Sequence, residues 1–357
     1  MFTADDLSSL RWDSTRGRVE IIDQTLLPHT LRWSHLENLA DFCRAISDMQ
    51  VRGAPLIGIT AAYGLANALA EDASNQHLER AYQALVATRP TAVNLQWALD
   101  QVSRSIGPLP VEERAAAALD SAHELRAADI AVCAQIGRNG ADVLPEADSG
   151  PLNIMTHCNA GWLATIQWGT ALAPVYQAVA RGREVHVWVS ETRPRNQGMN
   201  LTAWELQRAG VPCTVVADNS CGLLMEQGRV DCVIVGSDRT AANGDVCNKI
   251  GTYLKALAAR ANGIPFYVAL PGSTIDWKCA SGADIPIEER GGEEVLSMQG
   301  RDAAGELLEV RLAAADTLAY NPAFDVTPAA LVTGLITEAG VFSTTSEDLA
   351  ELRDRLA

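Results

Sequence analysis

Residues 152–161 read LNIMTHCNAG, a short apolar run that ends in a polar loop containing glycine. The same arrangement recurs further along the chain, with apolar runs at 152–157, 184–190, 213–217, 232–236 and 265–270. Each run is followed by a polar or Gly-rich turn and then by a helix-like stretch, as at 199–209 and 248–262. Runs that are apolar on both faces and separated by helices predict a parallel β-sheet covered on both sides.

The residues before this region have a different pattern. A short strand-like run at 18–23 is followed by Ala-rich stretches with apolar residues three and four positions apart. These stretches predict helices at about 38–48, 55–71, 76–88, 93–106 and 112–138. A polar connector with proline and glycine, residues 141–151, separates the two patterns. We therefore predict an α/β protein with a mainly helical N-terminal domain at 1–145 and a Rossmann-like parallel-sheet domain at 150–357.

The overall charge limits the classes of partner. The chain has 357 residues with 28 Lys and Arg against 44 Asp and Glu, which gives a formal net charge of −16. Such a surface repels polyanions, so we expect no nucleic-acid partner and no membrane partner. No apolar run reaches the roughly 18 residues of a spanning helix, and the sequence does not open on a basic segment followed by an apolar one. We therefore expect a cytoplasmic protein.

The sequence has no motif with the spacing typical of a metal site, a disulfide framework or a nucleotide-binding loop. The eight cysteines are scattered and form no CxxC pair, which favours free thiols over a disulfide framework. The six histidines are dispersed with no HExxH motif, so we expect no zinc site. A Walker loop and a GxGxxG fingerprint are also absent from the sequence, so we expect neither ATP nor NAD as a cofactor.

Polar loops follow the predicted strands, and ligands of such sheets bind at the carboxyl ends of the strands. THCNAG (156–161) follows the first strand and SETRPRNQG (190–198) the second. GSDRTAANGD (236–245) follows the fourth and leads into CNKIG (247–251), where we expect a helix to begin. Arginine side chains and backbone N–H groups at helix starts are common anion ligands. These loops therefore predict a site for a phosphate and for sugar hydroxyls.

A similar segment precedes the second predicted helix. In RGAP (52–55) the proline falls in the first helical turn, which places Arg52 at the positive end of the helix, and Gly53 would let a ligand approach the backbone. Simpler interpretations exist: an RGAP turn is usually an ordinary helix entry, Cys158 a small apolar side chain, and Asp238 a carboxylate paired with Arg239. The convergence of several loops at one edge of the sheet favours a functional site.

Seven segments occur in the order and with the separations of a known family. They are RGAP (52–55), THCNAG (156–161), ETRPRNQG (191–198), GSDRTAANGDVCNKIGTY (236–253), LPGSTID (270–276), IPIEER (285–290) and NPAFDVTP (321–328). Together they resemble the methylthioribose-1-phosphate isomerase family from about residue 20 to 340. Its superfamily also contains ribose-1,5-bisphosphate isomerases and the regulatory subunits of the eukaryotic translation-initiation guanine-nucleotide exchange factor.

The resemblance implies roles for particular residues. It implies that Cys158 and Asp238 form the catalytic pair, which the regulatory subunits generally lack together. It also implies substrate contacts by Arg52, Gly53, Ala54, Arg89, Gln197, Asn248 and Lys249. The residue patterns alone single out all of these except Arg89. Because Arg52, Arg89, Arg193, Arg195 and Lys249 lie in or beside the loops, we expect one cationic site in the acidic protein.

The implied reaction converts 5-methylthioribose 1-phosphate, an aldose, into the ketose 5-methylthioribulose 1-phosphate in methionine salvage, without metal or cofactor. Two alternatives stay open. One is isomerisation of a related 1-phosphopentose, such as ribose 1,5-bisphosphate or 5-deoxyribose 1-phosphate. The other is a non-catalytic regulatory subunit that binds a sugar phosphate. The resemblance and the long apolar C-terminal half also favour a homodimer.

Overall fold

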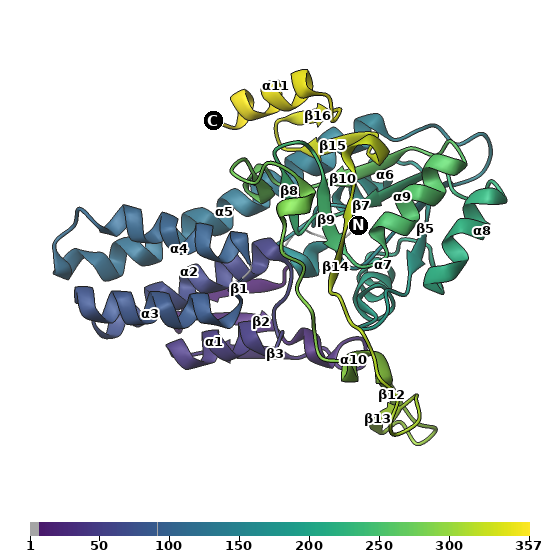
Figure 1. The fold of residues 1–357 in the computed structure, drawn as a ribbon. Coiled ribbons are helices and arrows are strands. Elements are labelled where there is room, and N and C mark those ends of the chain that lie inside the picture. The colour runs from purple at the N-terminus through teal and green to yellow at the C-terminus, as the bar shows by residue number, and fades with distance from the viewer. Residues whose placement is uncertain (1–6, 91) are drawn as a thin grey trace.

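The computed structural model describes residues 7–90 and 92–357, and its central element is a seven-stranded sheet (Figure 1). The strand order is β16-β15-β10-β7-β4-β5-β6. The strands are β4 (Leu152–Thr156), β5 (Val185–Ser190), β6 (Cys213–Val216), β7 (Cys232–Val235), β10 (Phe266–Ala269), β15 (Gly334–Thr337) and β16 (Gly340–Phe342). All neighbours are parallel except β15 and β16. The predicted α/β class is confirmed, and the five predicted strands begin and end within one residue of their observed bounds.

Both faces of this sheet are covered, because alternate strand residues point to opposite sides. Ile154, Val187 and Ile234 pack in one buried cluster, whereas Met155, Trp188 and Val233 pack in another. The first cluster includes residues of α5 (Val111–Val143), α6 (Ala173–Ala180) and α7 (Ala203–Arg208). The second includes residues of α8 (Cys221–Glu226), α9 (Thr252–Ala261) and α11 (Ser346–Leu356). This two-sided burial explains the continuous apolar runs in the sequence.

The first part of the chain is mainly helical, as predicted. Its helices are α1 (Leu39–Ser47), α2 (Ala54–Glu71), α3 (Asn75–Thr88), α4 (Val93–Ile106) and α5. Helix α2 is almost entirely buried, since α1, α3, α4 and α5 pack around it. A small antiparallel sheet of β1 (Leu10–Asp13), β2 (Arg18–Ile22) and β3 (Trp33–Leu36) precedes them; short initial strands were predicted here, of which only β2 was located by residue. Because α5 packs both on α2 and on α6, it joins the two parts, and the division at 145–150 stays a prediction.

A second sheet of four strands was not predicted. Its order is β11-β8-β9-β14, with β8 (Arg239–Ala241), β9 (Val246–Lys249), β11 (Ile275–Asp276) and β14 (Phe324–Thr327). The predicted helix start at 248 is wrong, because Asn248 and Lys249 end strand β9 and helix α9 begins only at Thr252. The physical reason is that β9 pairs with β14, which lies far along the chain and leaves no local signal.

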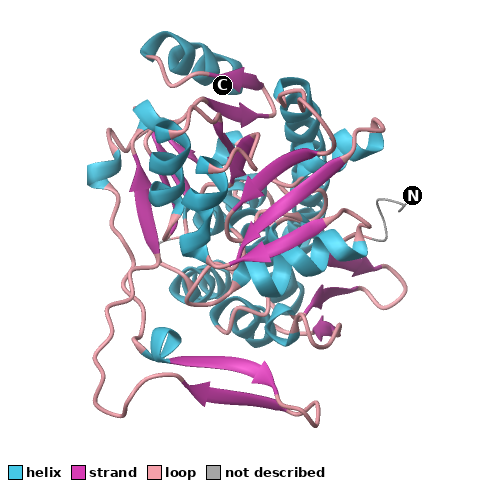
Figure 2. Ribbon diagram, turned by 90° about the vertical axis from the view of Figure 1, so that its right-hand side faces the viewer, coloured by secondary structure: helices cyan, strands magenta, loops and turns pink. Residues whose placement is uncertain are grey.

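Between β11 and β14 the chain also forms a short helix and a β-hairpin. Helix α10 (Glu293–Leu296) leads into a hairpin of β12 (Ser297–Arg301) and β13 (Leu307–Arg311), which projects from the rest of the molecule (Figure 2).

Within residues 7–90 and 92–357, no helix combines the length and the apolarity needed to cross a membrane.

Candidate active site

The strand order creates a crevice at one point of the large sheet. The chain runs from β4 outward to β5 and β6 and then returns to β7 on the other side of β4. Loops after β4 and β7 therefore leave in opposite directions, and ligands of open α/β sheets bind between such loops. A cavity of about 360 Å³ lies here, a volume suited to a small ligand. The structure thus has a cavity at the edge of the sheet where the sequence predicted a binding site.

All nine predicted site residues line this cavity. They are Arg52, Gly53, Ala54, Arg89, Cys158, Gln197, Asp238, Asn248 and Lys249. They come from the start of α2, the end of α3, the loops after β4, β5 and β7, and strand β9. The structure therefore brings together residues from both parts of the chain, and their individual roles stay predictions.

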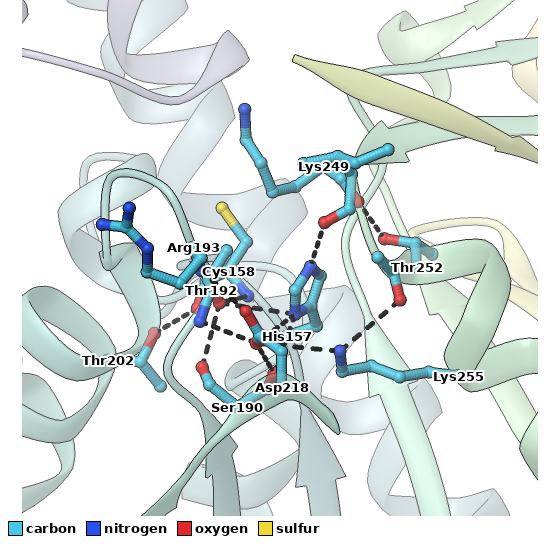
Figure 3. Close-up of polar contacts among 12 residues, drawn as sticks. His157, Cys158, Ser190, Thr192, Arg193, Thr202, Asp218, Lys249, Thr252 and Lys255 are labelled. Carbon is cyan, nitrogen blue, oxygen red and sulfur yellow. Dashed lines mark hydrogen bonds and ion pairs between the residues drawn. The ribbon is translucent and has the colours of Figure 1, made fainter. Parts of the chain in front are cut away.

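Cys158 follows strand β4 and has an unusual backbone conformation, with φ at 64°. Its N–H donates to Thr192 Oγ1 at 2.9 Å, and its carbonyl accepts from Thr202 Oγ1 at 2.7 Å (Figure 3). Burial raises the pKa of the Cys158 thiol, while Arg52 and Lys249 act to lower it. The net effect is upward, which favours the neutral thiol over the thiolate.

Asp238 follows strand β7, and its carboxylate is not paired with the adjacent arginine. The Arg239 Nε instead donates to Asp276 Oδ2 at 3.1 Å, so the alternative of an Asp238–Arg239 pair is wrong. Burial raises the pKa of Asp238, and the opposing influence of Lys249, Arg52 and Arg89 is smaller. A carboxyl group of this kind retains its proton to a higher pH than an exposed one.

Arg52 is fixed against the loop after β4. Its Nη1 donates to Asn159 Oδ1 at 2.5 Å and its Nη2 to Asn159 O at 2.8 Å. Asn159 in turn donates through Nδ2 to Glu205 Oε1 at 2.8 Å, and Glu205 is fully buried. This chain orients the Arg52 guanidinium without neutralising it, because the Asn159 amide carries no charge.

Gly53 lines the cavity and also packs against protein backbone. It caps α2 with φ at 98°, a conformation that side chains rarely adopt. A Cβ at this position would lie 2.4 Å from Ala164 O, so the glycine lets the backbone of Ala164 approach closely, and its contact with a ligand stays a prediction. Helix α2 then begins at Ala54 with Pro55 in its first turn and no side-chain cap, as the sequence indicated. Its positive end therefore lies at the cavity wall.

Lys249 and Asn248 enter the cavity from a strand rather than from a helix start. Lys249 Nζ donates to Ala323 O at 2.8 Å and lies 4.6 Å from the centre of the Phe324 ring. The N-terminus of α9 is already capped by Asp325, whose carboxylate accepts from the N–H groups of Gly251 and Tyr253 at 2.7 and 3.2 Å. The expected phosphate-binding helix start at 248–251 is therefore wrong.

A chain of ion pairs, which the residue patterns did not predict, runs along one wall of the cavity. Arg89 lies 3.6 Å from Glu288, Glu288 pairs with Arg290 at 3.1 Å, and Arg290 pairs with Glu294 at 2.6 Å. Glu294 also pairs with Arg195 at 2.8 Å. These arginines are compensated by carboxylates, and the adjacent Glu and Arg residues of IPIEER were the available signal.

The expected cationic cluster is accordingly smaller than predicted. Arg193 does not line the cavity, because its guanidinium donates to Pro194 O and to Val295 O at 2.8 and 2.7 Å. Arg52 and Lys249, by contrast, bond only to an amide and to carbonyl oxygens among the described residues. They are the two cations of the cavity whose charge no paired carboxylate offsets.

The fold defines a mixed α/β protein with a cavity at the switch point of a largely parallel sheet. The family model described as Initiation factor 2 subunit family matches residues 50–344. Methylthioribose-1-phosphate isomerase of Sinorhizobium medicae is 57% identical over 348 residues, which cover 96% of each chain. The enzyme of the same name from Methylorubrum populi is 58% identical over 338 residues, which cover 94% of this chain and 93% of that one.

Two solved structures share the fold. The 5-methylthioribose 1-phosphate isomerase of Pyrococcus horikoshii has a TM-score of 0.86 and 39% identity, with 99% of this chain and 98% of that one covered. The translation initiation factor eIF-2B, subunit delta, of A. fulgidus has a TM-score of 0.82 and 39% identity, with 98% and 99% covered. The chain belongs to the Initiation factor 2 subunit family and, within it, to the methylthioribose-1-phosphate isomerases, which confirms the resemblance seen in the sequence.

Proposed function

We propose that this protein is an aldose–ketose isomerase that converts 5-methylthioribose 1-phosphate into 5-methylthioribulose 1-phosphate in methionine salvage. The observation that carries the proposal is the cavity at the switch point, which Cys158 and Asp238 line together with Arg52 and Lys249. Relatives more than half identical along nearly the whole chain bear the name of this enzyme, which supports the assignment.

The substrate sets the chemical requirements. Its anomeric oxygen carries the phosphate, so no free aldehyde is in equilibrium with the ring. An acid must therefore protonate the ring oxygen, or charge must be stabilised at the anomeric carbon, before the ring opens. A hydrogen then moves from the second carbon to the first, either as a proton or as a hydride. The site needs one acid or base near each of two adjacent carbons.

Asp238 is the proposed general acid. Burial raises the pKa of its carboxyl, so a larger fraction carries a proton near neutral pH than for an exposed aspartate. Cys158 is the proposed partner at the second carbon, where a neutral thiol relays a proton or polarises the hydroxyl. The two groups come from the loops that flank the crevice, so a sugar bound between them would meet one on each side.

Arg52, Lys249 and the positive end of α2 are the proposed phosphate ligands. Gly53 and Ala54 lie at the start of this helix, where backbone N–H groups have no partner within the helix. Gln197, Asn248 and Arg89 are the proposed contacts to the sugar and to the remaining phosphate oxygens. Gln197 Oε1 is buried and has no hydrogen-bond partner among the described residues, so it is free to accept from a sugar hydroxyl.

Replacing Lys249 with glutamine should raise KM for the phosphorylated substrate by about 10- to 100-fold, since a hydrogen bond to a charged group contributes about 1.5–3 kcal/mol. The same change at Lys278, which is exposed and outside the cavity, is the matched control and should leave KM unchanged. Steady-state kinetics and inhibition by inorganic phosphate measure the effect. An unchanged KM in Lys249→Gln would remove this lysine from the phosphate site.

Specificity for the fifth carbon separates the proposal from isomerisation of a bisphosphate. A methylthio group needs apolar surroundings, and the cavity is lined by Met49, Ile57, Val93, Pro286 and Phe324 among others. A second phosphate would need a free arginine, whereas Arg195 and Arg290 are already paired with glutamates. These observations favour the methylthio substrate.

A panel of three substrates tests the proposed function. The purified protein is given 5-methylthioribose 1-phosphate, ribose 1,5-bisphosphate and 5-deoxyribose 1-phosphate, and kcat/KM is compared. We expect the first to give the highest value. A higher value for the bisphosphate would reassign the substrate, and no turnover of any sugar would favour a regulatory subunit.

We also propose that the protein is a cytoplasmic homodimer. Leu223 of α8 and Leu254 and Leu257 of α9 are exposed by 56%, 66% and 40%, and the two helices pack side by side. Such an apolar surface supports contact with another copy of the chain. Sedimentation equilibrium should give twice the 38.1 kDa chain mass, and a monomer at micromolar concentration would reject the dimer.

A further inference from the structure

The loops around Cys158 contain several residues in the left-handed backbone region. Cys158, Thr192 and Asn196 have φ values of 64°, 69° and 56°, although none is a glycine. For a β-branched residue such as Thr192 this conformation is especially uncommon. Backbone of this kind persists only where the surrounding structure holds it, and it is concentrated at functional sites.

Two threonines form hydrogen bonds with the main chain of Cys158, one with its N–H group and one with its carbonyl (Figure 3). Thr192 Oγ1, from the loop after β5, accepts from the Cys158 N–H at 2.9 Å. Thr202 Oγ1, from the π-helical turn Gly198–Thr202, donates to the Cys158 carbonyl at 2.7 Å. Both threonines are buried and neither lines the cavity, so their hydroxyls bond to protein groups, Cys158 among them, and not to a ligand.

Asp218, after strand β6, fixes Thr192 in turn. Its Oδ1 accepts from the Thr192 N–H at 2.8 Å and its Oδ2 from the Arg193 N–H at 2.7 Å. The Ser190 hydroxyl also donates to this carboxylate, and the buried Lys255 Nζ lies 3.9 Å from it. Asp218 thus accepts hydrogen bonds from three residues of the segment that supplies the Thr192 hydroxyl, namely Ser190, Thr192 and Arg193.

His157, the residue before Cys158, is held by hydrogen-bonding groups on both ring nitrogens and stays uncharged near neutral pH. Its ring is buried, with Nε2 2.8 Å from Ile250 O and Nδ1 3.2 Å from Ser190 Oγ. Burial lowers the pKa of His157 to about 3, with Lys255 adding to the effect. The neutral ring therefore donates from Nε2 to Ile250 O, and Nδ1 is left as an acceptor facing Ser190 and Thr192.

We propose that Thr192 and Thr202 are positioning residues that hold the Cys158 thiol in its reactive place, and that Asp218 keeps Thr192 in position. The kinetic part of this inference rests on the proposed isomerase function. A reacting group must be held within a fraction of an ångström, and the supporting hydrogen bonds provide that precision. Here the support acts on the backbone of the residue and not on its side chain.

The test compares Thr192→Val with Thr192→Ser. Valine is also β-branched and similar in shape, so it keeps the backbone preference and removes only the hydroxyl, whereas serine keeps the hydroxyl. We expect Thr192→Val to lower kcat by about 10²-fold, the cost of a small misplacement, with KM unchanged. Thr192→Ser should restore most of the rate. Thr202→Val and Thr202→Ser form a second pair with the same expectation, and thermal melts identify any variant that does not fold.

Alkylation of Cys158 by iodoacetamide in the free protein gives a readout independent of turnover. The modified peptide is quantified by mass spectrometry over a range of pH. Since burial raises the pKa of this thiol, releasing the loop in either valine variant should move the midpoint of the profile to lower pH. Wild-type kcat and a wild-type alkylation profile in both folded valine variants would overturn the inference. If the wild type turns over no sugar phosphate, the proposed function fails, and the alkylation profiles still decide on the positioning role.

Discussion

Replacing Asp238 with asparagine should lower kcat by about 10³-fold, because general acid catalysis contributes roughly 10²- to 10⁴-fold and an amide has no proton to give at this step. The substitution preserves shape, and it removes a negative charge only from those molecules in which the Asp238 carboxyl is ionised, in a cavity lined by Arg52 and Lys249. Binding of inorganic phosphate should therefore stay intact or become slightly tighter. The variant separates chemistry from binding, which is why it is the sharpest test of the site.

The pH profile adds a second measurement for the same residue. An acid works only while protonated, so wild-type kcat/KM should fall as pH rises through the Asp238 pKa, which burial raises above its ordinary value. Asp238→Asn should lose this limb of the profile. Asp316→Asn, at an exposed position outside the cavity, is the control and should behave as wild type. Near-normal turnover in Asp238→Asn would remove this carboxyl from the mechanism.

Replacing Cys158 with serine should lower kcat by about 10²-fold, since a hydroxyl of much higher pKa replaces a thiol as the proton-transferring group. Serine at this position keeps the backbone hydrogen bonds to Thr192 and Thr202, so the loop should be preserved. Turnover by the variant, compared with its phosphate affinity, measures the contribution of the sulfur. The matched control is Cys43→Ser, whose partly buried thiol lies on α1 away from the cavity.

Chemical modification tests the same thiol without mutation. Alkylation of wild-type protein should abolish turnover in proportion to the modified Cys158 peptide, and bound substrate should slow it, because the side chain lines the cavity that the substrate fills. The serine variant should show no such inactivation. Full activity after stoichiometric modification of Cys158 would contradict a role for the thiol in the reaction.

The arrangement of the arginines explains how an acidic protein offers an anion site. Arg89, Arg195 and Arg290 are paired with Glu288 and Glu294 along one wall. The net charge of −16 is therefore compatible with a small anion held by Arg52 and Lys249 and the start of α2. The overall field opposes polyanions, while the proposed anion site depends on a local pair of cations without paired carboxylates.

The sequence alone was sufficient to predict the strands and turns whose signals lie in neighbouring residues. Strands such as β4 and β7 are apolar on both faces because helices cover both sides of the sheet, and this leaves a continuous run that periodicity detects. The turn into α2 was likewise visible in RGAP, because proline and glycine restrict the backbone locally. The sequence therefore also predicted that the loops at the carboxyl ends of the strands, which carry Cys158 and Asp238, lie at one edge of the sheet.

Only the tertiary structure decided which groups act on one another. Lys249 lies on strand β9 because of pairing with β14, and Asp325 occupies the helix start predicted to bind phosphate. The pairing of Arg195 with Glu294, and the hold of Asp218 on Thr192, also join segments far apart in the chain. Periodicity reports whether a residue is buried, but not which distant residue buries it. The sequence therefore determined the sheet and the loops that carry the site, and long-range packing determined the charge and the geometry within it.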